Sequence, residues 1–323
     1  MSLLMTGARP TGGLHIGQYL AAFKPFVQRQ REFDQAVFIV SDLHMLTTGF
    51  SPERTKYLAA ATRRLVAEAV GFGVDPDVST FYLQSSVGWH ARIYAVLQSL
   101  ADISRLEQHG SFAEMARHSA DARPPSLGLL GYPVLESSDV LSIGPTHVCI
   151  GESNVSHFEH LAEIVELLHD GWGVNFTVPE MITGRKNLVG LDGSNKMSKS
   201  LGNAVFFADG PDALVRKVHG MSVRSTDGKI VAVEYLEALE APADLCRELE
   251  EDIENAGRVT ERAAKELADR LIAFIQPVDR AARELLASGA VDDLLQRGRD
   301  LAEDRGARAY HELAAKVGLL RLS

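Results

Sequence analysis

Two lysines spaced three residues apart, Lys196 and Lys199, stand in a polar segment that also holds Met197, Ser198 and Ser200. Glycines bracket this segment, which we treat as a loop over residues 191–203, and they allow it to bend. Two ammonium groups that converge on one set of anionic oxygens neutralise the charge that develops on a departing pyrophosphate. A solvated surface loop is the commoner role of such a segment, so its interpretation depends on the rest of the chain.

A second segment suited to phosphate, residues 9–18, reads Arg-Pro-Thr-Gly-Gly-Leu-His-Ile-Gly-Gln. It follows an apolar run at residues 3–5 and precedes a stretch in which apolar side chains recur at helical spacing. The glycines therefore lie at a strand-to-helix turn, where helix N-terminal amides attract phosphate. Gly12 and Gly13 allow the backbone to approach a nucleotide closely, and His15 is placed to donate a hydrogen bond to a phosphate oxygen. A glycine turn with a surface histidine is the alternative for this segment taken alone.

Alternating strands and helices are expected to hold these segments in place. Apolar runs predict strands over residues 3–5, 37–40, 80–83 and 147–150. Helical spacing predicts helices over residues 16–31, 52–70, 89–98 and 155–168, the second of them capped by Ser51. Repeated βα units indicate an α/β fold, a Rossmann-like, doubly wound parallel sheet. Ligands of such sheets bind at the carboxyl ends of the strands, near the switch in strand order. Each segment named above follows a predicted strand, so one cleft is expected.

From about Gly210 the strand patterns cease and amphipathic stretches follow. Helices are expected over residues 244–256, 259–286 and 291–317, and Pro277 is expected to kink or end the second of them. We therefore predict two domains. The first, residues 1–208, is nucleotide-binding and includes the lysine loop, and the second, residues 209–323, is all-helical.

The composition indicates a globular protein. The 323 residues are 46% hydrophobic, enough for a large domain and a smaller one, and neither a membrane span nor a secretory signal is apparent. Cys149 and Cys246 are too few for a disulfide framework or a four-cysteine metal site, and each is expected to be a small buried residue. His157 and His160 lack the further ligands of a recognised zinc spacing, so no metal site is predicted. The net charge of −10 argues against a general nucleic-acid coating but leaves room for a local basic patch.

Together, the segments Pro-Thr-Gly-x-Leu-His-Ile-Gly and Lys-Met-Ser-Lys-Ser form the two-part signature of class I aminoacyl-tRNA synthetases. Further motifs follow in the same order, with Ser-Asp-Leu-His at residues 41–44, Gly-Leu-Leu-Gly-Tyr-Pro-Val at residues 128–134 and Ser138-Asp139 after it. This order resembles the tryptophanyl-tRNA synthetases over residues 4–220 and only thinly beyond them. The helical region resembles the place where that family recognises the anticodon.

The resemblance implies a cytoplasmic tryptophan–tRNA ligase that uses ATP and Mg²⁺, has tryptophan and tRNA(Trp) as partners, is commonly a homodimer and has no role at a membrane. The amino-acid carboxylate attacks the α-phosphorus of ATP, and a tRNA ribose hydroxyl then takes the acyl group. His15 would support the α-phosphate, and Lys196 and Lys199 the leaving pyrophosphate. The implied ATP-binding residues are Arg9, Thr11, Gly12, Gly17, Gln18, Gly151, Ser153, Met197 and Ser198. The implied amino-acid-binding residues are Met5, Gly7, His44, Tyr132, Glu136, Asp139, Val148, Ile150 and Asn154.

The choice of amino acid rests mainly on Asp139. In the family an aspartate at this position accepts the indole N–H. Because a buried carboxylate without a partner is costly, we expect a ligand that lacks this donor to be rejected. The alternative is that Ser137, Ser138 and Asp139 cap the start of a helix.

Two departures from the family pattern concern the same pocket. The family has Gly-Glu-Asp-Gln where this chain has Gly151-Glu152-Ser153-Asn154. The aspartate and glutamine that ordinarily contact the ribose and the amino acid are thus replaced by shorter side chains. Glu136 stands where the family has an apolar or amide residue, and a carboxylate there needs a cation, such as the ammonium of a ligand. Our hypothesis is that the pocket is altered, either in a resistant or duplicate tryptophan enzyme or for a related amino acid.

Two other interpretations remain open. One is a paralogue that adenylates an aromatic amino acid for another acceptor or pathway. The other is a sensor that binds an amino acid or a nucleotide without catalysis, against which the lysine loop and His15 both argue. A generic nucleotidyltransferase explains the phosphate-directed segments but not Tyr132 together with Asp139.

Overall fold

The computed structural model describes residues 1–323 apart from 49, 109–111, 113–124, 186–187, 200 and 321–323. Its centre is a parallel sheet in the order β3-β2-β1-β4-β5. The strands are β1 (Leu3–Ala8), β2 (Gln35–Val40), β3 (Ser79–Leu83), β4 (His147–Ile150) and β5 (Glu180–Thr183). Strand order reverses between β1 and β4, so the predicted doubly wound parallel sheet is confirmed.

Helices surround this sheet and continue beyond it. In the first two thirds of the chain they are α1 (Ile16–Gln18), the π-helical turn η1 (Tyr19–Phe23), α2 (Lys24–Arg29), η2 (Leu43–Met45), α3 (Pro52–Thr55), α4 (Leu58–Gly71), η3 (Gln84–Ser86), α5 (Trp89–Leu97), α6 (Ile103–Gln108), α8 (Leu127–Ile143), η4 (Glu152–Asn154) and α9 (Val155–Trp172). The later helices are α10 (Pro211–His219), α11 (Val231–Ala238), α12 (Ala243–Ala256), α13 (Glu261–Ser288) and α14 (Ala290–Lys316).

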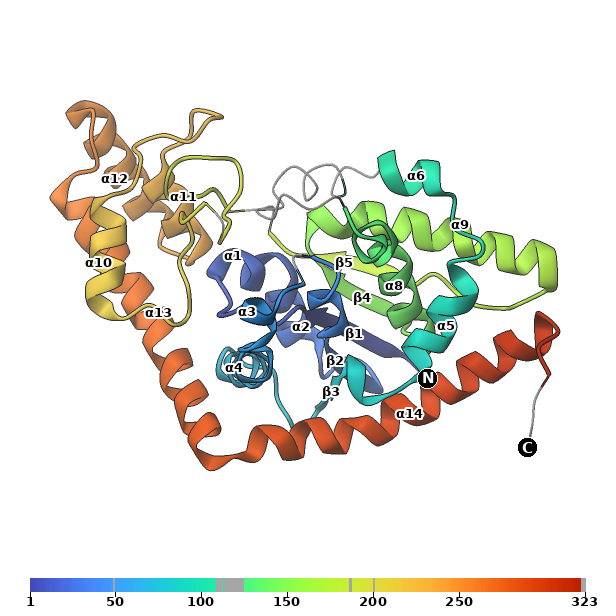
Figure 1. The fold of residues 1–323 in the computed structure, drawn as a ribbon. Coiled ribbons are helices and arrows are strands. Elements are labelled where there is room, and N and C mark those ends of the chain that lie inside the picture. The colour runs from blue at the N-terminus through green and yellow to red at the C-terminus, as the bar shows by residue number, and fades with distance from the viewer. Residues whose placement is uncertain (49, 109–111, 113–124, 186–187, 200, 321–323) are drawn as a thin grey trace.

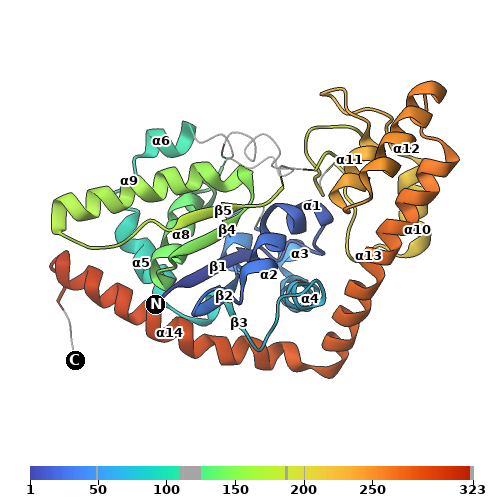
Figure 2. The ribbon, with the colours of Figure 1, turned by 180° about the vertical axis from the view of Figure 1, so that it is seen from behind.

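The strands bury both faces, because successive side chains point to opposite sides of the sheet. Leu4 and Phe38 belong to a core shared with α2 and α4, whereas Met5 and Val37 belong to a core shared with α5, α8 and α9. Helices thus cover both faces of the sheet (Figures 1 and 2). Chain crossovers of this kind leave the carboxyl ends of β1 and β4 free to form a site.

The C-terminal helices descend from one end of the molecule and then turn back beneath the sheet (Figure 1). Helix α13 packs against α4, and α14 packs against β3, α5 and α8. Gly298 permits the close approach of α14 to β3, since a Cβ there would lie 1.8 Å from the carbonyl oxygen of Phe81. The all-helical character expected after residue 210 is confirmed for the described residues, while the domain boundary at residues 208–209 stays a prediction.

Several local expectations need correction. Of the two outcomes expected at Pro277, an end of the helix is wrong, because α13 continues through this residue. The helix expected after Ser51 is broken near Tyr57 into α3 and α4, although Ser51 does cap α3. Helix α8 was not predicted, because it is apolar almost all round and contains Pro133, so it lacks an amphipathic pattern. Strand β5 was not predicted either, because it is short and largely exposed. In the described part of the chain, no helix combines the length and apolar character that crossing a bilayer requires.

Candidate active site

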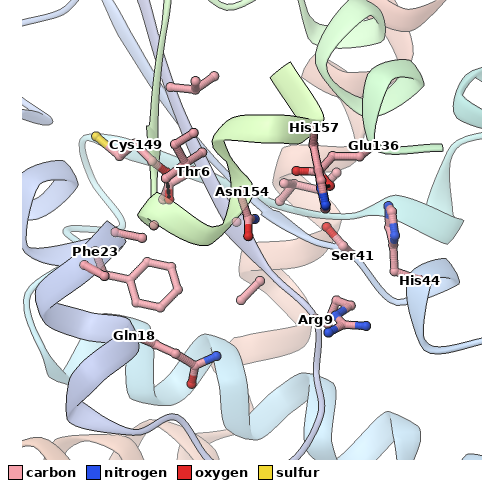
Figure 3. Close-up of a pocket in the computed structure, with 18 of the residues that line it drawn as sticks. Thr6, Arg9, Gln18, Phe23, Ser41, His44, Glu136, Cys149, Asn154 and His157 are labelled. Atoms are coloured by element: carbon pink, nitrogen blue, oxygen red, sulfur yellow. Dashed lines mark hydrogen bonds and ion pairs between the residues drawn. The ribbon is translucent and has the colours of Figure 1, made fainter. Parts of the chain in front are cut away.

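A cavity of about 650 Å³ opens at the carboxyl ends of β1 and β4, where strand order reverses. Figure 3 shows Glu136 and His157 at one side of it and Gln18 and Phe23 at the other. The predicted site residues that line it are Met5, Gly7, Arg9, Thr11, His15, Gly17, Gln18, His44, Tyr132, Glu136, Asp139, Val148, Ile150, Gly151, Asn154, Lys196 and Met197. Segments far apart in sequence therefore meet at one site, as the ends of parallel strands require.

Four predicted residues do not line the cavity. Gly12 and Lys199 lie in contact with each other at its rim, and Ser198 lies beside them in the lysine loop. The side chain of Ser153 falls outside the described part of the structure. The lining also contains residues that were not predicted as site residues, which are Thr6, Ala8, Ala21, Ala22, Phe23, Ile39, Ser41, Val140, Cys149, Ser156, His157, Phe158 and Leu188. Ser41 follows β2 directly, so the rule that ligands bind at strand ends was the signal that could have found it.

His15 caps the N-terminus of α1. Its Nδ1 accepts the backbone N–H of Gln18 at 3.3 Å, and the Gln18 side chain accepts the backbone N–H of His15 in return. Burial, reinforced by Lys199 and Lys196, lowers the pKa of His15 to about 4. The ring is therefore neutral at physiological pH, and because Nδ1 accepts, its proton lies on Nε2. This arrangement leaves an N–H donor for an anionic ligand at the start of a helix.

Lys199 joins the two signature segments. Its Nζ donates to the Thr11 hydroxyl at 2.8 Å and to the Gly12 carbonyl at 3.1 Å. Burial lowers the pKa of Lys199 to about 8, opposed by Glu68 and assisted by Arg9. Lys196 is exposed and lines the cavity. Two ammonium groups therefore stand on the side of the cavity that His15 faces, where they can bind a polyphosphate.

The lysine loop is internally organised. The buried side chain of Asn203 accepts the Ser198 amide at 2.7 Å and donates to Asp192, Ser194 and the Lys196 carbonyl. Backbone hydrogen bonds from Ile16 to Val205 and from Phe207 to Leu14 tie the segment after the loop to the His15 turn. These bonds set the distance between the lysines and His15 before any ligand enters.

Helix α8 presents three polar side chains to the cavity. Tyr132, Glu136 and Asp139 are spaced four and three residues apart, which places them on one face of a helix. Ser126 caps the start of α8 by accepting the Leu129 amide at 3.1 Å. Because α8 extends to Ile143, Asp139 lies in its last turns, and the alternative that this residue caps a helix start is wrong.

Glu136 has a histidine partner from α9. Its carboxylate contacts Nδ1 of His157, and Nε2 of the same ring lies 3.2 Å from the Tyr132 hydroxyl. Burial acts to raise the pKa of Glu136, but His157 outweighs it and holds that pKa below its usual range. The carboxylate is therefore ionised in the cavity wall, and His157 supplies the compensation that the sequence analysis sought from a ligand.

Asp139 is surrounded by donors. His44 Nε2 lies 3.1 Å from one carboxylate oxygen, while His90 Nδ1 and Gln84 Nε2 lie 3.0 and 2.6 Å from the other. Burial acts to raise the pKa of Asp139, but the hydrogen bonds from His44 and His90 hold it below its usual range. Three protein donors therefore already meet this carboxylate, and the expectation that a ligand lacking the indole N–H is rejected stays a prediction.

Both cysteines are buried, as expected from the sequence. Burial raises the pKa of Cys149 to about 12, so its thiol remains protonated although it lines the cavity. The part of the chain that the structure describes contains no group of three or more His, Cys, Asp or Glu side chains placed to hold a metal ion.

Residues 2–286 match the family model described as tRNA synthetases class I (W and Y). The chain is 34% identical to the tryptophan–tRNA ligase of Treponema pallidum over 88% of its own length and 87% of that protein's. It is 32% identical to the tryptophan–tRNA ligase of Chlamydia caviae, with 91% and 89% covered.

Two solved structures show the same fold. The tryptophanyl-tRNA synthetase of Mycoplasma pneumoniae superposes with a TM-score of 0.85 at 20% identity, with 99% of this chain and 98% of that chain covered. The synthetase of Campylobacter jejuni, solved with ADP and tryptophan, gives a TM-score of 0.82 at 25% identity, with 99% and 100% covered.

Proposed function

Because this chain belongs to the class I tRNA synthetase family for tryptophan and tyrosine, we propose that it activates tryptophan with ATP and transfers it to tRNA(Trp). The observation that carries this proposal is the meeting of three segments at one cavity. His15 and the lysine loop form its phosphate side, and the polar face of α8 forms its amino-acid side. A tryptophan carboxylate and an ATP α-phosphate would come together between them.

The first reaction needs positioning and charge stabilisation rather than a protein nucleophile. A carboxylate oxygen of tryptophan attacks the α-phosphorus, the bond to the β-phosphate oxygen breaks, and pyrophosphate leaves. We assign His15 Nε2–H to a nonbridging α-phosphate oxygen. Lys196 and Lys199 then stabilise the charge on pyrophosphate. In the second reaction a terminal ribose hydroxyl of tRNA attacks the acyl carbon and releases AMP.

For ATP, we propose that adenine lies over Gly17. A Cβ there would lie 3.2 Å from His15 Nδ1 and 3.3 Å from Met197 Sδ, so a larger residue would crowd this side of the cavity. The remaining contacts to ATP are proposed for Arg9, Thr11, Gly12, Gln18, Gly151, Ser153 and Ser198. We propose that Mg²⁺ arrives bound to the ATP phosphates, as is usual for nucleotide sites.

For tryptophan, we propose that the ionised Glu136 and the Tyr132 hydroxyl face the α-ammonium group. Asp139 would accept the indole N–H as well, because an ionised carboxylate has about four acceptor sites and three protein donors do not fill them. The remaining pocket residues are Met5, Gly7, His44, Val148, Ile150 and Asn154. The pairing of Glu136 with His157 supports the hypothesis that this pocket is altered, because it introduces a carboxylate and its histidine partner into the amino-acid side.

We also propose a homodimer in the cytoplasm, where tRNA charging serves translation. Helix α14 covers the β3 edge of the sheet, whereas β5 at the opposite edge is largely exposed. Large apolar side chains are exposed on β5, on α9 and between them, which are Leu167, Trp172, Val178 and Met181. An exposed strand edge with apolar side chains suits pairing with a second copy of the chain.

The deciding experiment is ATP–pyrophosphate exchange with each of the twenty amino acids, followed by charging of total tRNA. Tryptophan-dependent exchange with charging is the expected result. Exchange without charging would indicate a paralogue that serves another acceptor, and exchange with a different amino acid would implicate Glu136. Amino-acid binding without exchange would instead indicate a sensor.

A further inference from the structure

A buried carboxylate outside the cavity lies beneath the turn that carries His15. Glu68 on α4 is fully buried, and its two oxygens have different partners. Oε2 accepts the backbone N–H of Leu14 at 2.7 Å, and Oε1 accepts Nε of Arg64 at 2.7 Å. Leu14 directly precedes His15, so Glu68 holds the point at which the chain enters α1.

The same group is linked to the C-terminal helices. Arg64 also donates through Nη2 to Asp279 of α13 at 2.9 Å, and Asp279 is only 4% exposed. Helices α4 and α13 lie close together beside this contact, since a Cβ on Gly71 would lie 2.6 Å from the carbonyl oxygen of Val278. A continuous chain of hydrogen-bonded charges thus runs from α13 through α4 to the backbone of the His15 turn.

Packing alone does not account for this arrangement. Apolar side chains can join two helices without the desolvation cost of buried carboxylates, and such replacements of buried ion pairs are often neutral or stabilising. An apolar residue in place of Glu68 could not, however, accept the buried Leu14 amide, which would then have lost its acceptor. The carboxylate therefore performs a task at the turn that packing between helices does not require.

We propose that Glu68 is a positioning residue for His15, and that the Asp279–Arg64–Glu68 chain makes the placement of His15 depend on α13. The proposal rests on the proposed adenylation reaction. A neutral His15 must place its Nε2–H at a phosphate oxygen, and small displacements of a catalytic group lower rates steeply. A movement of α13 relative to the sheet would displace His15 through the side chains of Asp279, Arg64 and Glu68.

The test compares Glu68→Gln with wild type in tryptophan-dependent ATP–pyrophosphate exchange. Glutamine has the same shape but loses the charge that pairs with Arg64, and its single oxygen cannot accept from both Leu14 and Arg64 as the two carboxylate oxygens do. We expect kcat to fall about ten-fold, while tryptophan affinity measured by calorimetry changes less than about two-fold. The matched control is Asp292→Asn, which removes the exposed Arg63–Asp292 pair between α4 and α14 and is expected to leave kcat unchanged.

A double-mutant cycle separates positioning from a general loss of structure. If Glu68 acts through His15, Glu68→Gln has little further effect on kcat in a His15→Ala background. Additive losses would overturn the proposal. Asp279→Asn leaves the Glu68–Leu14 bond in place, and we expect a smaller fall, about three-fold, with the same dependence on His15.

Asp279→Asn also decides the matter if Glu68→Gln does not fold, because an Asp279 variant with wild-type kcat would overturn the link to α13. A wild-type chain that shows no exchange would contradict the proposed function alone. In that case the same double-mutant cycle is measured as ATP affinity by calorimetry. Additive losses of ATP affinity in Glu68→Gln and His15→Ala would again overturn the inference.

Discussion

The two sides of the cavity are built in different ways. The phosphate side consists of a glycine turn, a helix start and a loop, and backbone hydrogen bonds such as Ile16 to Val205 hold its parts together. The amino-acid side consists of side chains on α8 whose carboxylates are contacted by residues from elsewhere, such as His157 on α9 and His90 on α5. Each part of the phosphate side takes its form from local backbone geometry before distant hydrogen bonds join the parts, whereas the amino-acid side depends throughout on which helices pack together.

This difference explains where function could be recognised in the sequence. Glycine turns and helix caps are formed by residues that are close together in the sequence, so the chemistry of the His15 turn can be inferred from a short sequence segment. A buried ion pair between two helices leaves no local pattern. His157 accordingly drew attention only as a metal ligand, although the structure places it between Tyr132 and Glu136.

The largest expected effect is on the phosphate side. Lys199→Met removes a cation that would stabilise pyrophosphate, and we expect kcat for ATP–pyrophosphate exchange to fall about 10²–10³-fold. Tryptophan affinity, measured by calorimetry, should stay within about two-fold, since the two sides are separately built. Lys265→Met, at an exposed pair with Asp269, is the control. A fall of less than about three-fold for Lys199→Met would contradict the role given to this lysine.

A smaller effect is expected on the amino-acid side. Glu136→Gln removes the charge that would face the tryptophan ammonium, and loss of one charge-assisted hydrogen bond predicts an affinity for tryptophan about ten-fold weaker. The KM for ATP should not change. The control is Glu159→Gln, an exposed carboxylate on the same helix as His157. Unchanged tryptophan affinity and selectivity in Glu136→Gln would show that this carboxylate is only structural.

The smallest effect concerns pH. The pKa of Lys199 is lowered to about 8, so its positive charge is present below that pH and is lost as the pH rises through it. We expect kcat/KM for ATP in the exchange assay to fall about four-fold between pH 7 and 8.5. Lys199→Arg keeps its charge over this range, so the decline should disappear. Since the pKa of His15 is lowered to about 4, this residue should cause no change between pH 5 and 8.

The accuracy of the predicted fold follows the same division. The strand at residues 147–150 was placed correctly to the residue, because a buried parallel strand is a continuous apolar run. Helix α9 was also found, since Phe158, Leu161 and Ile164 recur at helical spacing. Helix α8 was missed because burial on all sides removes that spacing. Strand β5 was missed because Glu180 and Met181 are exposed and form no apolar run.

The sequence by itself determined the βα order, the turn before α1 and the lysine loop, because each depends on interactions among residues close together in the chain. Only the tertiary structure decided that His157 balances Glu136, that three donors meet Asp139 and that Asp279 connects to Leu14 through Arg64 and Glu68. Buried charges must find partners wherever the packing of distant elements offers them, and that choice belongs to the whole fold.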